Sequence, residues 1–236
     1  MENRADLGGT LEEILTYSLT SSDSKMQVVF RFRDNQLSKY QLVLIEGAPI
    51  YSVTQPSIPL DEAKGVLARL SVYENAPYIK NMTDMLNMMV GSAANLELVS
   101  GNLKLNTTSV GEATQYVWIY TENGVDFSPK TFDLVFSNQV MTDLIDDMFL
   151  FTIGSTAVNI SADKAVSIAR DQLGSYKVLE PPTVLFHPNT RNSLVLYPYW
   201  SVTFTLNGVY ENNVNTINIG VWADTGQVAR VKTYAS

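Results

Sequence analysis

The clearest candidate for catalysis in this chain is Asp224-Thr225-Gly226, the triplet that supplies one carboxylate to the paired-carboxylate site of aspartic proteases. Such a site needs two carboxylates that share a proton, and the sequence has one such triplet. It is followed by Gln227, where a small residue is usual, and only ten residues follow Gly226. We therefore interpret the triplet as a tight turn, with a carboxylate-based hydrolase as the weakest alternative.

The other residue types that support catalysis or metal binding are scarce. His187 is the only histidine and precedes Pro188 in a polar segment, so we expect it in a surface turn; the chain has no cysteine. These counts exclude multi-histidine metal sites, thiol catalysis and disulfides. Asp143, Asp146 and Asp147 form a small acidic cluster without the spacing of a calcium loop. We interpret it as a solvated acidic face, and whether it binds a cation stays open. The sequence thus predicts no catalytic residue, no cofactor and no metal site.

Two apolar groups could instead contact a partner. Methionines are concentrated between residues 82 and 90, and methionine-rich helices adapt to varied partners. Two tyrosines flank a proline at residues 197–199 and could line a groove. The residues we name as a candidate partner surface are Met85, Met88, Met89, Tyr197 and Tyr199. The alternative is the commoner use of such side chains, which is to fill a core.

Composition narrows the classes of partner. The 236 residues carry a net charge of −8, which repels phosphate backbones and excludes nucleic acid as a partner. No apolar run approaches the roughly 20 residues of a membrane helix. Residues 1–4 lead into no apolar run, so we expect either a cytoplasmic protein or one whose export signal, or membrane tether, is missing from this sequence.

Periodicity and turn signals predict an α+β fold with antiparallel β-sheets, each covered by a helix. An N-terminal helix is expected over residues 10–19, with Thr10 as its N-cap, followed by a β-meander. A helix over 60–70 should bury one face, and a methionine-rich helical stretch follows it over 82–90. Ser161 is a good N-cap for a third helix. That third helix has an apolar stripe made of Ala162, Ala165, Val166, Ala169 and Leu173. Residues 96–105 should form a hairpin, and residues 143–151 fit no clear pattern. The strands expected in the meander are 26–33, 40–45 and 50–53. The later strands expected are 115–121, 131–136, 184–186, 194–197, 200–206, 216–222 and 228–234.

A weak internal repeat divides the chain. Residues 58–63 align with 160–165, and 117–125 align with 201–209, so that each copy has a helix and an Asn-Gly hairpin. The first copy carries an insertion of about the size of the methionine-rich helix. We therefore predict three regions. They are 1–56, an N-terminal helix and meander; 57–156, a degenerate unit with the insertion; and 157–236, the standard unit.

The second copy resembles the PepSY family. The matching segments are the helix ISADKAVSIARDQL, the strand YPYWSVTF with a turn at LNG, and the closing strand INIGVWADTGQV. The first copy has Ser137-Asn138-Gln139-Val140 where the second has Asp224 to Val228. This resemblance implies a non-enzymatic module outside the cytoplasmic membrane, secreted or membrane-anchored, that binds a protein or peptide and modulates or inhibits a peptidase.

Two other functions remain alternatives. Low charge and three Asn-x-Ser/Thr sequons fit a structural spacer of the cell envelope equally well. A deep pocket with several convergent polar groups of perturbed pKa would instead favour an enzyme. For the binding module, we expect an exposed sheet edge or a concave sheet face to hold the partner.

Overall fold

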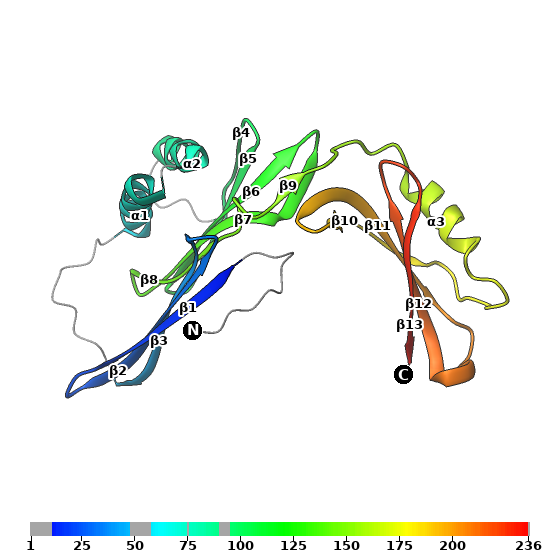
Figure 1. Ribbon diagram of the computed structural model, residues 1–236, viewed down its shortest axis with the longest axis horizontal. Helices are drawn as coiled ribbons and strands as arrows, with labels where there is room; N and C mark the ends of the chain where they lie inside the picture. The colour runs from blue at the N-terminus through cyan, green and yellow to red at the C-terminus, as the bar shows by residue number, and fades with distance from the viewer. Residues whose placement is uncertain (1–10, 48–57, 75, 90–94, 236) are drawn as a thin grey trace. The chain divides into compact units, whose positions relative to one another are not determined.

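The computed structural model describes residues 11–47, 58–74, 76–89 and 95–235 (Figure 1). It confirms an α+β fold with antiparallel sheets and three α-helices in the described residues. The chain divides into two compact units. Unit 1 comprises 1–121 and 130–150, and unit 2 comprises 122–129 and 151–236.

Unit 1 is built on a sheet in which eight described strands are hydrogen-bonded in the order β1-β2-β3-β8-β7-β6-β5-β4. The strands are β1 (Glu12–Thr20), β2 (Ser24–Arg33), β3 (Gln36–Gly47), β4 (Glu97–Ser100), β5 (Leu103–Val110), β6 (Ala113–Glu122), β7 (Val125–Ser137) and β8 (Val140–Asp146). The strands of the predicted N-terminal region therefore share one sheet with those of the predicted second region. Asn123 and Gly124 both have positive φ, which fits a two-residue hairpin turn between β6 and β7.

Two helices, α1 (Pro59–Glu74) and α2 (Pro77–Met88), contribute to the core of unit 1. Helix α1 buries the five residues that periodicity predicts: Leu60, Ala63, Val66, Leu67 and Leu70. Helix α2 buries Ile79, Met82, Met85 and Leu86. They pack with aromatic residues of β6 and β7, including Trp118 and Phe132, whose rings meet edge to face at 5.7 Å. Burial of these apolar side chains holds the helices on the sheet.

Unit 2 packs one helix, α3 (Ala162–Arg170), on a second antiparallel meander. Its strands are β10 (Thr183–Asn192), β11 (Val195–Thr205), β12 (Val214–Trp222) and β13 (Val228–Ala235); the short β9 (Thr152–Ile153) pairs with β11 in parallel. Ser161 caps α3 as predicted, since its Oγ accepts a hydrogen bond from the Lys164 amide at 3.3 Å. Ala165, Ala169 and Leu173 from the predicted stripe are buried.

The repeated segments occupy equivalent places in the two units. In unit 1, α1 precedes β5, β6, β7 and β8, which are neighbours in sequence order. In unit 2, α3 precedes β10, β11, β12 and β13, which are likewise neighbours in sequence order. Helix α2 lies in the insertion of the first copy, and β1–β3 extend its sheet beyond β8.

The predicted N-terminal helix is wrong. Residues 12–20 form β1, which pairs with β2 over nine residues from Glu12↔Arg33 to Thr20↔Lys25. Leu15, Tyr17 and Leu19 alternate with polar or smaller residues, and β2 offers them an apolar neighbour, so tertiary pairing overrides the local signal. The expected N-cap, Thr10, and the expected strand 50–53 lie outside the described residues.

Three further local predictions need correction. His187 lies on β10 and not in a surface turn. The following residue, Pro188, is tolerated in this strand because β10 lies at the edge of its sheet. Asn207 and Gly208 do not form a two-residue hairpin, because residues 206–213 connect β11 to β12. The unassigned segment 143–151 contains the end of β8, which is buried at Leu144 and Asp146.

Candidate functional site

The sheet of unit 1 splits between β3 and β8. The two strands pair antiparallel at Lys39↔Ile145, Tyr40↔Leu144 and Gln41↔Asp143, and the ladder stops there. Continuation of this register would place Leu42 opposite Thr142 and Leu44 opposite Val140. β3 continues to Gly47 and stays paired with β2 along this length, so its side toward β8 has no strand partner in the described residues.

An irregularity in β8 explains why the ladder stops. β8 pairs with β7 at Val135↔Asp143 and then at Phe136↔Met141, so Thr142 is an extra residue in β8. Its hydroxyl donates to the Val135 carbonyl at 3.4 Å. A bulge of this kind bends its strand and increases the local twist, which turns β8 away from β3.

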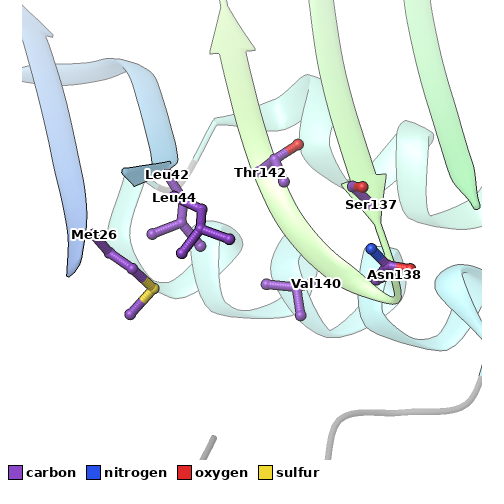
Figure 2. Close-up of a pocket in the computed structure, with 7 residues that line it drawn as sticks. All are labelled: Met26, Leu42, Leu44, Ser137, Asn138, Val140 and Thr142. Atoms are coloured by element: carbon purple, nitrogen blue, oxygen red, sulfur yellow. The ribbon is translucent and has the colours of Figure 1, made fainter. Parts of the chain in front are cut away.

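The split opens a pocket of about 290 Å³. Figure 2 shows that Met26, Leu42 and Leu44 line it from β2 and β3, while residues of β7, β8 and their turn line the other side. The residues of this second side are Ser137, Asn138, Val140 and Thr142. The pocket therefore combines apolar side chains with a strand edge that pairs with no other described strand.

Large apolar side chains are exposed at the end of β3 that forms this pocket. Leu44 is 50% exposed, Ile45 is 60% exposed and Val43 is 39% exposed. Consecutive exposed apolar residues on a strand are unusual for a solvated surface and are typical of binding sites. We name the pocket, together with residues 42–47 of β3 and 140–142 of β8, the split-sheet groove.

A buried carboxyl lies elsewhere in unit 1, between α2 and the sheet. Asp146 is 1% exposed and accepts hydrogen bonds from the Tyr78 hydroxyl at 2.8 Å and the Met148 amide at 2.9 Å. Burial raises the pKa of Asp146 to about 7, although these two hydrogen bonds oppose the shift. Burial and the Asp146 charge raise the pKa of Tyr78. The pair therefore joins α2 to β8 through a satisfied hydrogen bond.

Tyr78 also lines a second pocket, of about 310 Å³. Its other polar lining residues are Asn81, Asn102, Tyr120 and Lys130, and Pro77, Leu103 and Met148 complete its wall. Burial lowers the pKa of Lys130, which donates a hydrogen bond to the Met148 carbonyl. Both groups of shifted pKa, Tyr78 and Lys130, are thus bonded to the protein itself. The pocket holds polar groups, as an enzyme site would, but Asp146, the carboxyl that accepts the Tyr78 hydrogen bond, is not among the residues that line it.

The other face of the sheet carries an ionic network. Arg33 contacts Glu12 at 3.1 Å and Asp147 at 3.2 Å, and links β1 and β2 to the end of β8. Burial raises the pKa of Asp147, while Arg33 and Arg31 lower it. Burial and the Asp147 charge raise the pKa of the neighbouring Asp133 to about 6. These contacts join β1 and β2 to the rest of the sheet.

The three aspartates of the predicted acidic cluster face different partners and do not form a solvated face. Asp146 faces Tyr78, Asp147 faces Arg33, and Asp143 pairs with Gln41 at the end of the ladder. In residues 11–47, 58–74, 76–89 and 95–235 no group of three or more histidine, cysteine or acidic side chains could hold a metal ion. These three aspartates therefore do not form a metal site.

The Asp-Thr-Gly segment closes the β12–β13 hairpin, as the sequence predicts. Gly226 has φ +75° and its amide donates to the Trp222 carbonyl at 2.8 Å. The Asp224 carboxylate accepts a hydrogen bond from Arg191, whose guanidinium lies 4.0 Å from the Tyr197 ring centroid and 4.4 Å from that of Trp222. Asp224 therefore neutralises a stacked arginine, and no second carboxylate faces it in the described residues of this turn.

The five residues predicted as a partner surface belong to two different units, and three of them are buried. Met85, Met89 and Tyr199 are 0%, 7% and 0% exposed, whereas Met88 is 57% exposed. Tyr197 is half-buried against Arg191 and Trp222. Met85, Met89 and Tyr199 therefore fill a core, as the alternative interpretation predicts. Of the three methionines named, only Met88 is exposed to a partner.

The split-sheet groove is not predicted from the sequence alone. The alternation of Tyr40, Leu42 and Leu44 is visible in the sequence, and it indicates an apolar face on this strand. The pairing of β3 with β8 joins residues about a hundred positions apart, and the bulge at Thr142 has no composition signal. Neither the pairing nor the bulge can be predicted from the sequence without the tertiary structure.

Comparisons with known proteins show a weak structural likeness and no family. No protein-family model matches the chain, and no curated protein matches it. None of the described helices is long and apolar enough to span a membrane. Among solved structures, the chain is similar to the Bacillus megaterium YpeB C-terminal domain, with 14% sequence identity over 95% of this chain and 90% of that chain and a TM-score of 0.30.

Proposed function

We propose that this protein is a non-catalytic binding module that holds an extended segment of a partner polypeptide in the split-sheet groove. The observation that carries the proposal is the ladder between β3 and β8, which stops after Gln41↔Asp143 although β3 continues to Gly47. A strand edge with free amide and carbonyl groups pairs most favourably with another strand. The main chain then supplies affinity, and the pocket selects side chains.

The chemistry of the groove indicates which segments fit. Side chains of a bound strand alternate between the two faces of the sheet, so every second residue would point toward Leu42, Leu44 and Met26. These positions favour apolar residues. The intervening positions lie on the other face, where Val43 is 39% exposed and pairs with Gln27, so they tolerate polar side chains.

The resemblance of unit 2 to the PepSY family supports two finer proposals. The module works outside the cytoplasmic membrane, and its partner is a peptidase or a peptidase propeptide. An exported module with this groove would bind the peptidase, or its propeptide, through an extended segment of that partner.

The binding proposal is tested with the full chain and a phage-displayed library of random peptides of about 12 residues. We expect enriched peptides to alternate apolar and polar residues. Bound peptide should slow amide hydrogen exchange in residues 42–47 and 140–142. The variant Leu44→Glu should weaken binding by roughly tenfold or more, because it places a charge in the apolar pocket.

A matched control is Val231→Glu on β13, where the wild-type side chain is 49% exposed, as against 50% for Leu44. This variant should bind the enriched peptides as the wild type does. Failure to enrich any peptide, or equal binding by Leu44→Glu, would contradict the proposal.

For the peptidase proposal, the purified protein is added to an envelope extract that hydrolyses casein. A change in the rate of casein hydrolysis that the wild type causes and the Leu44→Glu variant does not would support the peptidase proposal. An unchanged rate would contradict it.

A further inference from the structure

The edges of the two sheets differ in how they are protected against pairing with another strand. β4 has four residues, β10 contains Pro188, and β13 carries Arg230 and Lys232. Short length, proline and positive charge are the usual devices that prevent edge-to-edge association. β1, at the remaining edge, has none of them.

The sequence of β1, Glu12–Thr20, contains no proline, lysine or arginine, and its nine residues pair with β2 without a register shift. Residues 16–20 are exposed, with Tyr17 at 52% and Leu19 at 48%. Figure 1 shows β1 beside β2 in unit 1, and β2 is its strand neighbour in the described residues. β1 is therefore a long, regular and uncharged edge along most of its length.

The faces of β1 are also self-complementary. Leu15, Tyr17 and Leu19 lie on the same face as Phe30, Val28 and Met26, which are their partners in β2. The Tyr17 and Phe30 rings meet edge to face at 6.0 Å. Ile14, Thr16 and Ser18 lie on the opposite face. A strand that pairs with β1 must have the same alternation, and β1 itself has it.

We propose that two copies of this chain associate through antiparallel pairing of their β1 strands about a two-fold axis at Thr16. Paired side chains lie on one face, so odd-numbered residues must meet odd-numbered residues. Centring the pairing on Thr16 satisfies this condition and includes all nine residues, from Glu12 opposite Thr20 to Thr20 opposite Glu12. Leu15 then meets Tyr17 of the partner subunit, and Glu13 meets Leu19 of the partner subunit.

The charges of β1 are compatible with this register. Its two acidic residues, Glu12 and Glu13, lie at one end, and two-fold pairing places the uncharged end of the other copy against them. No like charges therefore face each other, and Glu12 keeps its ion pair with Arg33. The association would extend each sheet of unit 1 into one continuous sheet without using the split-sheet groove.

The test measures the mass of the full chain by sedimentation equilibrium between roughly 1 and 200 µM, because one pair of strands is a small interface. We expect a reversible dimer with twice the protomer mass. Thr16→Lys should raise the dimer dissociation constant roughly tenfold or more, because it places two lysines opposite each other. Thr16→Glu should have the same effect. An equimolar mixture of the two variants should recover the dimer, because lysine then faces glutamate.

Thr233→Lys on β13 is the control, since it adds the same charge to another exposed edge strand and should leave the dimer intact. Circular dichroism confirms that each variant is folded. A wild type that is monomeric at every concentration would overturn the proposal and leave β1 open to a strand of another protein. A dimer unaffected by Thr16→Lys, or one that the mixture does not restore, would equally overturn it.

Discussion

At the scale of single residues, Asp146 is the side chain whose ionisation should affect stability most clearly. Its carboxyl is 1% exposed, and burial raises its pKa from the usual 3.8 of an aspartate to about 7. The folded state therefore holds this proton more tightly than the unfolded state does. The stability contribution is complete below about pH 4 and is lost as the pH rises to about 7.

The variant Asp146→Asn should flatten this pH dependence. It removes the ionisable group and keeps an oxygen that can accept the Met148 hydrogen bond. Relative to the wild type, its free energy of unfolding should be higher at pH 8 by up to about 4 kcal/mol. Urea unfolding at pH 4, 6 and 8 measures this difference. Asp143→Asn, on the same strand but partly exposed, is the control for loss of one charge. A difference that does not vary with pH would show that Asp146 does not titrate in this range.

Asp224 should matter for stability and not for hydrolysis. Its carboxylate is the partner of Arg191, and both side chains are largely buried. Asp224→Asn keeps the shape but weakens a charged hydrogen bond, so we expect a loss of about 2 kcal/mol in the free energy of unfolding. Urea unfolding measures it. A folded variant of unchanged stability that loses a hydrolytic activity of the wild type would instead support the carboxylate hydrolase.

At the scale of elements, α2 has one face in the core and one in solvent. Met85 is fully buried and Met88 is 57% exposed, although they are three residues apart. Met85→Ala should lower the free energy of unfolding by about 2–5 kcal/mol, because it leaves a cavity. Met88→Ala should change it by less than about 0.5 kcal/mol. Equal losses would show that α2 is docked in a different rotation.

Element prediction from the sequence succeeded where the signal is local. The buried face of α1 follows from the spacing of its apolar residues, and the cap of α3 follows from Ser161. It failed for β1, whose acidic start favours a helix but whose structure depends on pairing with β2. The split-sheet groove depends on a pairing between β3 and β8 that no local pattern encodes. The fold class could thus be predicted, and the candidate site could not.

At the scale of the whole molecule, the two units have separate cores. The core of unit 1 contains buried residues between Leu60 and Met148, and that of unit 2 contains buried residues between Ala165 and Val221. The two sets share no residue. A compact unit with its own apolar core can fold without its neighbour. Each unit therefore has a complete helix–sheet interface of its own.

This organisation predicts that residues 151–236 fold alone. They contain α3, β9 to β13 and the helix–sheet core of unit 2, and they lack the 122–129 segment of that unit, in which Val125 and Phe127 are buried. The heteronuclear NMR spectrum of this fragment should be dispersed and should overlay on the corresponding resonances of the full chain. Residues 1–150, which contain the core of unit 1, β1 and the split-sheet groove, should also fold, dimerise as the full chain does, and bind the same peptides. A collapsed spectrum for 151–236 that sharpens only when 1–150 is added would show that the two cores do not fold independently.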